Sequence, residues 1–145
     1  MPVTKPALLI VLDTNVLVSG LLKRSGPPGR ILELILSGAI QLALDVRILD
    51  EYTRVLGRPA LKIPFSAARQ VLDYLAIAAE WVTAEPLQPI PPHILDLADL
   101  PFAEVAITAR AWALVTGNQR HFFFLKDYGL PVLTPADFLA SQPSQ

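Results

Sequence analysis

The 145-residue sequence contains no cysteine. The chain therefore has no disulfide framework, no zinc site built from thiolates and no cysteine nucleophile. Histidine is also scarce, because only His93 and His121 are present. Any metal ion would have to be bound by oxygen ligands or by these two imidazole rings.

A long uncharged apolar stretch is missing as well. The longest apolar run lies near the N-terminus, and Asp13 interrupts it before it reaches the roughly 18 residues that a membrane-spanning helix needs. No cleavage site of small residues follows this run, so the sequence predicts neither a signal peptide nor a membrane anchor. We therefore expect a cytoplasmic protein.

The sequence has no large excess of charge of one sign. Twelve basic and thirteen acidic residues give a formal net charge of −1, so the overall electrostatic field does not indicate a nucleic-acid-binding protein. Local basic groups remain, among them Arg47, Arg54 and Arg58 in one segment. Such arginines either contact an anionic substrate or belong to an ordinary solvated surface.

Length and composition indicate a single domain that comprises residues 1–145. A chain of this length buries roughly two thirds of its unfolded surface when it folds, and a second domain is not expected. Hydrophobic residues make up 52% of the sequence and charged residues 17%. This composition predicts an unusually apolar surface, so we expect a homodimer or a stable protein partner.

Helical and extended patterns alternate along the chain without internal repeats. Short apolar runs bounded by turn residues predict strands at 8–12, 40–44, 81–83, 113–116 and 132–133. Capping residues, early prolines and terminating glycines predict helices, counted with their caps, at 14–22, 30–37, 45–56, 66–79, 101–111 and from 134 onward. Strands separated by helices imply an α/β fold, a three-layer α/β/α sandwich around a mostly parallel sheet.

The end of the first predicted strand is the most informative feature of the sequence. Residues 8–12 are apolar without alternation, as in a strand buried on both faces, and Asp13, Thr14 and Asn15 follow directly. In α/β proteins, ligands bind at the carboxyl edge of the parallel sheet. Asp13 is therefore a candidate metal ligand; alternatively, it only caps the helix that follows.

Further acidic residues fall at the ends and faces of predicted helices. Glu51 shares a polar helical stripe with Arg47, so it is either a site residue or an exposed partner of that arginine. Asp99 precedes a helix that begins near Pro101, where it either joins Asp13 or acts as a helix cap.

Two more acids and two polar residues complete the candidate set. Asp96 lies just before the helix near Pro101, and Glu104 lies one turn into it, where it could simply favour the positive end of the helix. The fourth predicted strand ends in polar residues, Thr116 and then Asn118, as the first strand ends in an acid. Both strand ends are expected at the same edge of the sheet.

Five segments together form a pattern that no single one of them would establish. They are VLDTNVLVSG at 11–20, DEYTRVLGRP at 50–59, DLPFAEVA at 99–106, VTGNQRHF at 115–122 and LTPADFL at 133–139. In this order they resemble the PIN domains, metal-dependent nucleases with an α/β/α sandwich, over nearly the whole chain. The sequence is most similar to the branch formed by toxins of bacterial and archaeal toxin–antitoxin systems, which implies an RNA substrate and an antitoxin partner.

The resemblance also implies roles for individual residues. The catalytic and metal-binding carboxylates would be Asp13, Glu51 and Asp99, with Glu51 either a ligand or a residue that positions water. Polar neighbours would orient these carboxylates or the RNA phosphate, and they are Thr14, Asn15, Thr116 and Asn118.

Asn118 departs from the family pattern, because many members carry a fourth aspartate at this position. An amide oxygen can coordinate a cation but adds no negative charge. A second metal ion would therefore be held more weakly, unless Asp96 or Glu104 compensates.

The chemistry explains why such residues would be gathered. Neighbouring carboxylates repel one another and raise each other's pKa values, and a divalent cation removes that cost. Mg²⁺ or Mn²⁺ would bind these oxygens together with a phosphodiester oxygen, and would lower the pKa of a bound water. We therefore expect an Mg²⁺- or Mn²⁺-dependent endoribonuclease that hydrolyses single-stranded or looped RNA, as the toxin of a toxin–antitoxin pair.

Other classes of protein are also considered. A noncatalytic RNA-binding or scaffold protein with a degenerate metal site is the main alternative, favoured by Asn118 and the near-neutral charge. A receiver domain would need a phosphoacceptor aspartate at the end of a central strand and a lysine after a later strand, and neither is evident. A haloacid-type phosphatase would need Asp-x-Asp, but Asn15 replaces the second acid.

Overall fold

The computed structural model describes residues 7–141. In this range five strands form one sheet, and every strand is parallel to its neighbours. The strands are β1 (Leu8–Leu12), β2 (Ile40–Leu44), β3 (Glu80–Trp81), β4 (Ala113–Val115) and β5 (Val132–Leu133), and their order in the sheet is β3-β2-β1-β4-β5. The predicted α/β sandwich is confirmed, with a sheet that is parallel throughout the described part.

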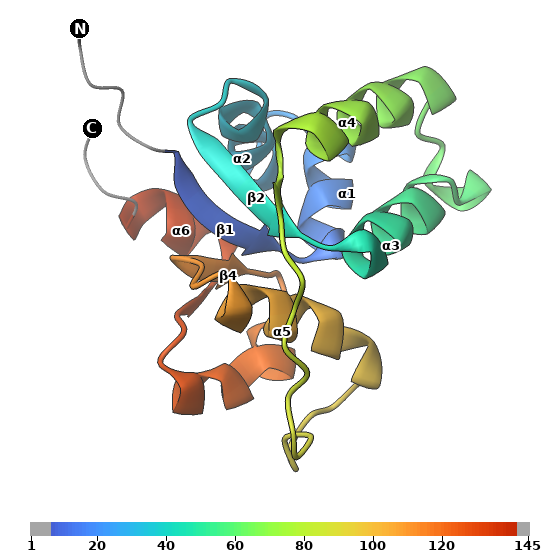
Figure 1. Cartoon of the computed structure of the whole chain (residues 1–145). Coiled ribbons are helices and arrows are strands. Elements are labelled where there is room, and N and C mark those ends of the chain that lie inside the picture. The colour runs from blue at the N-terminus through green and yellow to red at the C-terminus, as the bar shows by residue number, and fades with distance from the viewer. Residues whose placement is uncertain (1–6, 142–145) are drawn as a thin grey trace, which may run out of the picture.

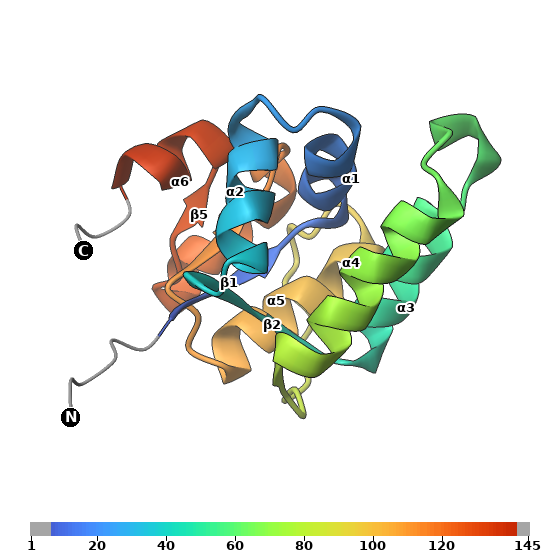
Figure 2. The ribbon, with the colours of Figure 1, turned by 90° about the horizontal axis from the view of Figure 1, so that it is seen from above.

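Helices cover both faces of this sheet. They are α1 (Thr14–Leu22), α2 (Pro27–Leu36), α3 (Val46–Leu56), α4 (Phe65–Ala78), α5 (Leu100–Thr108) and α6 (Pro135–Ser141). Helix α5 lies on one side of the central strands, and α2 and α6 lie together on the other (Figures 1 and 2). Within residues 7–141, no helix is long and apolar enough to cross a membrane.

Several element boundaries differ from those predicted. Helix α2 begins at Pro27 rather than at residue 30, because proline is well suited to the first turn of a helix. Helix α4 begins at Phe65, so Ser66 lies inside the helix and is not its cap. Helix α5 ends at Thr108, and Arg110 adopts a left-handed conformation with φ 52°, which turns the chain toward β4 three residues earlier than expected. Strand β3 comprises residues 80–81 instead of 81–83.

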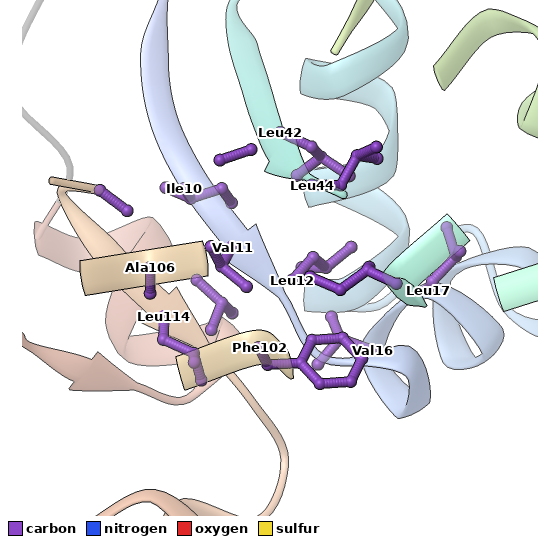
Figure 3. Packing of buried hydrophobic residues seen from close by; sticks show 14 of the residues in the cluster. Ile10, Val11, Leu12, Val16, Leu17, Leu42, Leu44, Phe102, Ala106 and Leu114 are labelled. Atoms are coloured by element: carbon purple, nitrogen blue, oxygen red, sulfur yellow. The ribbon is translucent and has the colours of Figure 1, made fainter. Parts of the chain in front are cut away.

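The core is built around the central strands. Ile10, Val11 and Leu12 of β1 are at most 1% exposed, as expected for a parallel strand that is covered on both faces. Figure 3 shows them gathered with side chains from β2, β4, α1 and α5, among them Phe102. Full burial of such a side chain stabilises the fold by roughly 1.5–3 kcal/mol. Strand β1 is consequently a rigid support for the residues that follow it.

The strand order determines where a site can form. The chain runs outward from β1 to β2 and β3, and then returns to place β4 on the other side of β1. The carboxyl ends of β1 and β4 are paired, with Leu12 opposite Val115. Where the strand order reverses in this way, the connections diverge and leave a crevice that binds ligands. Asp13 and Thr116 are the first residues beyond these two strand ends.

Candidate functional site

Asp13 is held at the crevice by donors from two elements. Its Oδ1 accepts a hydrogen bond from the backbone N–H of Thr14 at 2.8 Å, and its Oδ2 accepts one from the Thr116 hydroxyl at 2.7 Å. The Thr116 hydroxyl in turn accepts a hydrogen bond from the N–H of Asn118 at 3.0 Å. Asp13 is thus the N-cap residue of α1, as the alternative interpretation holds, and it also joins the ends of β1 and β4.

Glu51 reaches the same crevice because Tyr52, the next residue, anchors α3. Tyr52 is fully buried and donates its hydroxyl to the Leu12 carbonyl at 2.5 Å, which fixes α3 against the end of β1. Burial raises the pKa of Tyr52 well above its usual value, so the hydroxyl stays protonated as a donor. Glu51 then accepts a hydrogen bond from the Thr14 hydroxyl. Its other carboxylate oxygen lies 3.7 Å from a guanidinium nitrogen of Arg54.

Asp99 points toward the 3-10 segment Gln119–Tyr128. Its Oδ2 lies 2.9 Å from Nδ1 of His121, and its side chain makes no capping hydrogen bond although it precedes α5. The cap in this region is Asp96, which accepts from the N–H of Ala98 at 2.9 Å. Asp96 therefore caps the 3-10 turn Leu97–Asp99, whereas Asp99 occupies the N-cap position of α5 without a capping hydrogen bond from its side chain.

These residues share one pocket of about 460 Å³. The predicted site residues on its wall are Asp13, Thr14, Asn15, Glu51, Asp96, Asp99 and Asn118. Thr116 lies beneath the pocket and is fully buried, with its hydroxyl against Asp13. We call this hollow the carboxylate pocket.

The carboxylate pocket also contains residues that the sequence pattern did not place there. His121 was considered only as one of two imidazoles, and its partner Asp99 lies 22 positions earlier in the chain. Arg54 and Arg58 line the pocket as well. Their clustering was visible in the sequence, but their position in the lining of the pocket depends on how α3 packs.

Glu104 lies elsewhere, which corrects its assignment to the site. Its Oε1 is 2.8 Å from Nη1 of Arg47, and its Oε2 accepts a hydrogen bond from the N–H of Leu87 at 2.9 Å. It lines a neighbouring hollow of about 710 Å³. Glu104 lies five positions after Asp99, which corresponds to a rotation of about 140° around a helix, so the two side chains point in different directions.

The alternative in which Glu51 pairs with Arg47 is also wrong. Arg47 is bound instead between the nearly buried carboxylates of Glu104 and Asp45, at 2.8 Å from each. This arginine therefore neutralises two acids outside the carboxylate pocket. Glu51 remains available to the pocket.

Burial raises the pKa of the Asp13 carboxyl above its usual value. Hydrogen bonds from Thr116 and Thr14 lower this pKa, whereas the negative charges of Asp99 and Glu51 raise it. The net shift is upward, so the ionised carboxylate is less favourable in the folded protein than in the unfolded chain.

Burial is also the main cause that raises the pKa of Asp99. The hydrogen bond and charge of His121 lower it, and the charges of Asp96 and Glu51 raise it. Two aspartates of one pocket thus resist ionisation. A cation placed between them would relieve this unfavourable electrostatic energy.

The donor atoms of the carboxylate pocket suit a hard divalent cation, because they are carboxylate and amide oxygens. Among the described residues, no three or more His, Asp or Glu side chains form a group that could hold a metal ion by themselves. Mg²⁺ commonly keeps several waters and binds through one or two carboxylates together with substrate phosphate. Asp13 and Asp99 are the carboxylates of this pocket that would bind an ion in this way.

Known proteins share the sequence pattern and the fold of this chain. A sequence model of the PIN domain matches residues 9–120, a range that contains all the predicted site residues. The fold is similar to the crystal structure of VapBC2 from Rickettsia felis bound to a DNA fragment from their promoter, with a TM-score of 0.55 and 19% identity over 88% of this chain and 98% of that chain. No curated protein matches the sequence. Because the family model matches most of its length, the chain belongs to the PIN-domain family.

Proposed function

We propose that this PIN domain is an Mg²⁺- or Mn²⁺-dependent endoribonuclease that hydrolyses single-stranded or looped RNA. The observation that supports this most strongly is the carboxylate pocket, where Asp13, Glu51 and Asp99 come together from three separate segments at the point where the strand order reverses. The raised pKa values of Asp13 and Asp99 support this proposal, because a bound cation would relieve the unfavourable negative charge. PIN domains are generally nucleases, in accord with this chemistry.

In this proposal Asp13 and Asp99 bind the cation, and Glu51 either binds it or positions a water. The cation, when bound, would neutralise the carboxylates, polarise a phosphodiester oxygen and lower the pKa of a coordinated water. The chain's own contribution is orientation, because Thr116, Thr14 and His121 each hold one or two of the carboxylates through the hydrogen bonds described above.

Arginines of α3 and the turn after it would bind the RNA phosphates. Arg54 and Arg58 line the carboxylate pocket, and the Arg54 side chain is 63% exposed. Its ion pair with Glu51 is long, and an exposed pair of this kind contributes little stability. Arg54 can therefore exchange this partner for a phosphate, and Asn15 and Asn118 add polar groups to the same wall.

The proposal includes a role as the toxin of a toxin–antitoxin pair, with an antitoxin protein as partner. The sequence resemblance and the similarity to the VapBC2 structure support this role. A homodimer and a cytoplasmic location belong to the same proposal. Exposed apolar side chains such as Leu97, which is 63% exposed, are compatible with a protein partner.

The experiment that tests the activity uses purified protein and an end-labelled RNA with a single-stranded loop. We expect cleavage with Mg²⁺ or Mn²⁺ and none after chelation. Because water is the nucleophile, the products should lack 2′,3′-cyclic phosphate ends, which distinguishes this activity from that of a metal-independent ribonuclease. Cleavage that is unchanged by chelation would contradict the proposal.

A noncatalytic RNA-binding protein is the second candidate. It is favoured by the lack, within residues 7–141, of a ready-made three-ligand group, and by the amide at Asn118. RNA binding in the same assay without cleavage in either metal would support this candidate.

Asn118 provides a prediction about metal affinity. Asn118→Asp adds a negative charge to the wall of the carboxylate pocket, so half-maximal activity is expected at a several-fold lower metal concentration. Without metal the added repulsion should lower the melting temperature, and the gain on adding metal should be larger than in the parent protein. Melting curves against Mg²⁺ or Mn²⁺ concentration measure both effects.

The matched control for this charge is Gln70→Glu on the exposed face of α4, outside the carboxylate pocket. It adds the same charge and should leave the metal dependence unchanged. Superimposable curves for Asn118→Asp and the parent protein would place Asn118 outside the field of the metal.

A further inference from the structure

Another hollow adjoins the carboxylate pocket on a different side from the one that Glu104 lines, between α3 and α4. Its volume is about 220 Å³, and the lining residues that matter here are Leu56, Arg58, Lys62, Phe65, Arg69 and Leu72. We call it the α3–α4 groove. The two helices run side by side, and their connection lies at the edge of the molecule (Figures 1 and 2). Arg58 lines both the groove and the carboxylate pocket, so the two hollows adjoin.

All the charged residues that line the α3–α4 groove are basic. Arg58, Lys62 and Arg69 line it, and none of its lining residues is acidic. Arg69 is paired with Asp73 at 3.1 Å, but the two side chains are 66% and 61% exposed, so this pair is weak. Three cations next to a pocket that would hold a phosphodiester complement the charge of a longer polyanion.

An aromatic ring lies among these cations. Phe65 is 80% exposed at the first residue of α4, while Leu56 at the base of the groove is 2% exposed. An exposed aromatic ring beside basic side chains is the arrangement on which bases of single-stranded nucleic acid stack. Stacking accepts any base, because every base has a π-face.

The backbone of the connection between α3 and α4 is conformationally restricted. Pro59 and Pro64 restrict it on either side of Lys62, which adopts φ 55° and donates its N–H to the Pro59 carbonyl at 3.1 Å. Ordering such a segment on binding costs little conformational entropy. The basic and aromatic side chains are therefore presented on a firm support.

We propose that the α3–α4 groove is a second contact site for the RNA strand whose scissile phosphate occupies the carboxylate pocket. This inference rests on the proposed function. The strand passes Arg58, brings phosphates to Lys62 and Arg69, and stacks a base on Phe65. The groove thereby selects unpaired RNA, because a base within a duplex cannot stack on the ring.

The test measures binding of a fluorescent 12-nucleotide single-stranded RNA by anisotropy, in an Asp13→Asn background that prevents cleavage. Phe65→Ala should weaken binding about tenfold, the effect typical of losing one stacked base. The matched control is Ile77→Ala, which removes an 87% exposed apolar side chain from the same helix but outside the groove. It should leave the affinity unchanged.

A second pair of variants isolates the charge. Arg69→Gln and Asp73→Asn both abolish the same ion pair, but only Arg69→Gln removes a cation from the groove. Only Arg69→Gln should weaken binding, by several-fold, and it should reduce the slope of log affinity against log salt concentration by about 0.7. If the two variants weaken RNA binding equally, the ion pair between Arg69 and Asp73 contributes to binding and the positive charge of Arg69 in the groove does not.

The outcomes separate this inference from the proposed function. If the wild-type protein cleaves RNA and both Phe65→Ala and Arg69→Gln bind RNA like their parent, the groove is not an RNA site and the proposed function stands. If these variants lose binding to a protein partner while RNA affinity is unchanged, the groove is a protein-binding surface and the inference is overturned. If the parent neither binds nor cleaves RNA, the proposed function fails and this inference fails with it.

Discussion

Asp13→Asn is expected to reduce metal-dependent RNA cleavage at least about 100-fold and to leave the fold intact. Asp13 has the central position in the carboxylate pocket, and even residues that only orient a metal ligand commonly cost 10- to 100-fold when they are removed. The amide oxygen can still accept the hydrogen bond from Thr14, so α1 keeps its cap. Cleavage rates at saturating Mg²⁺ or Mn²⁺ measure the effect.

The same variant should be more stable than the parent protein when metal is removed. The pKa of the Asp13 carboxyl is raised, chiefly by burial, so ionisation of this carboxyl destabilises the folded protein. The destabilisation is absent at a pH below the pKa of Asp13 in the unfolded chain. It is complete at a pH above the raised pKa in the folded protein. At neutral pH, neutralisation should raise the melting temperature, and loss of the hydrogen bond from Thr116, which the amide nitrogen of asparagine cannot accept, should offset part of this gain.

Asp50→Asn is the matched control for these measurements. Asp50 lies next to Glu51 in the sequence, but it is exposed and does not line the carboxylate pocket. The control should keep the activity of the wild-type protein. If Asp13→Asn cleaves RNA at the wild-type rate in the same metal, Asp13 is a helix cap and nothing more.

Thr116→Val is expected to lower the cleavage rate about 10- to 100-fold without any change in the metal ligands themselves. The Thr116 hydroxyl donates to Asp13 and accepts from the N–H of Asn118, and valine has a similar shape but no hydroxyl. Its loss frees one oxygen of Asp13 to rotate and raises the pKa of this carboxyl further, because the hydrogen bond from Thr116 lowers that pKa. Single-turnover rates and metal titrations measure these effects.

The stability of Thr116→Val should fall as well. Thr116 is fully buried, and a buried group left without its hydrogen-bond partner costs about 1–3 kcal/mol. Thr116→Ser keeps the hydroxyl and should retain most of the activity. Equal activity of the valine and serine variants would show that the hydroxyl does not position Asp13.

The sequence by itself determined the fold class and the position of Asp13 at the end of a buried strand. Short apolar runs without alternation are typical of strands that are covered on both faces, so the run before Asp13 predicted a central strand with this acid at its carboxyl end. The five segments that resemble PIN domains likewise predicted the family that the comparison confirms. The apolar run is a signal within one short segment of the chain. The family resemblance combines five such segments in a known order.

Only the tertiary structure decided which polar side chains share the pocket. The pairing of His121 with Asp99 and that of Arg47 with Glu104 join elements far apart in the chain, and no periodicity within one element encodes them. Whether an acid on a helix faces the site or a neighbouring arginine depends on how that helix is rotated and packed. This rotation is determined by buried contacts such as that of Tyr52 with the end of β1, which form only when the whole sheet is assembled.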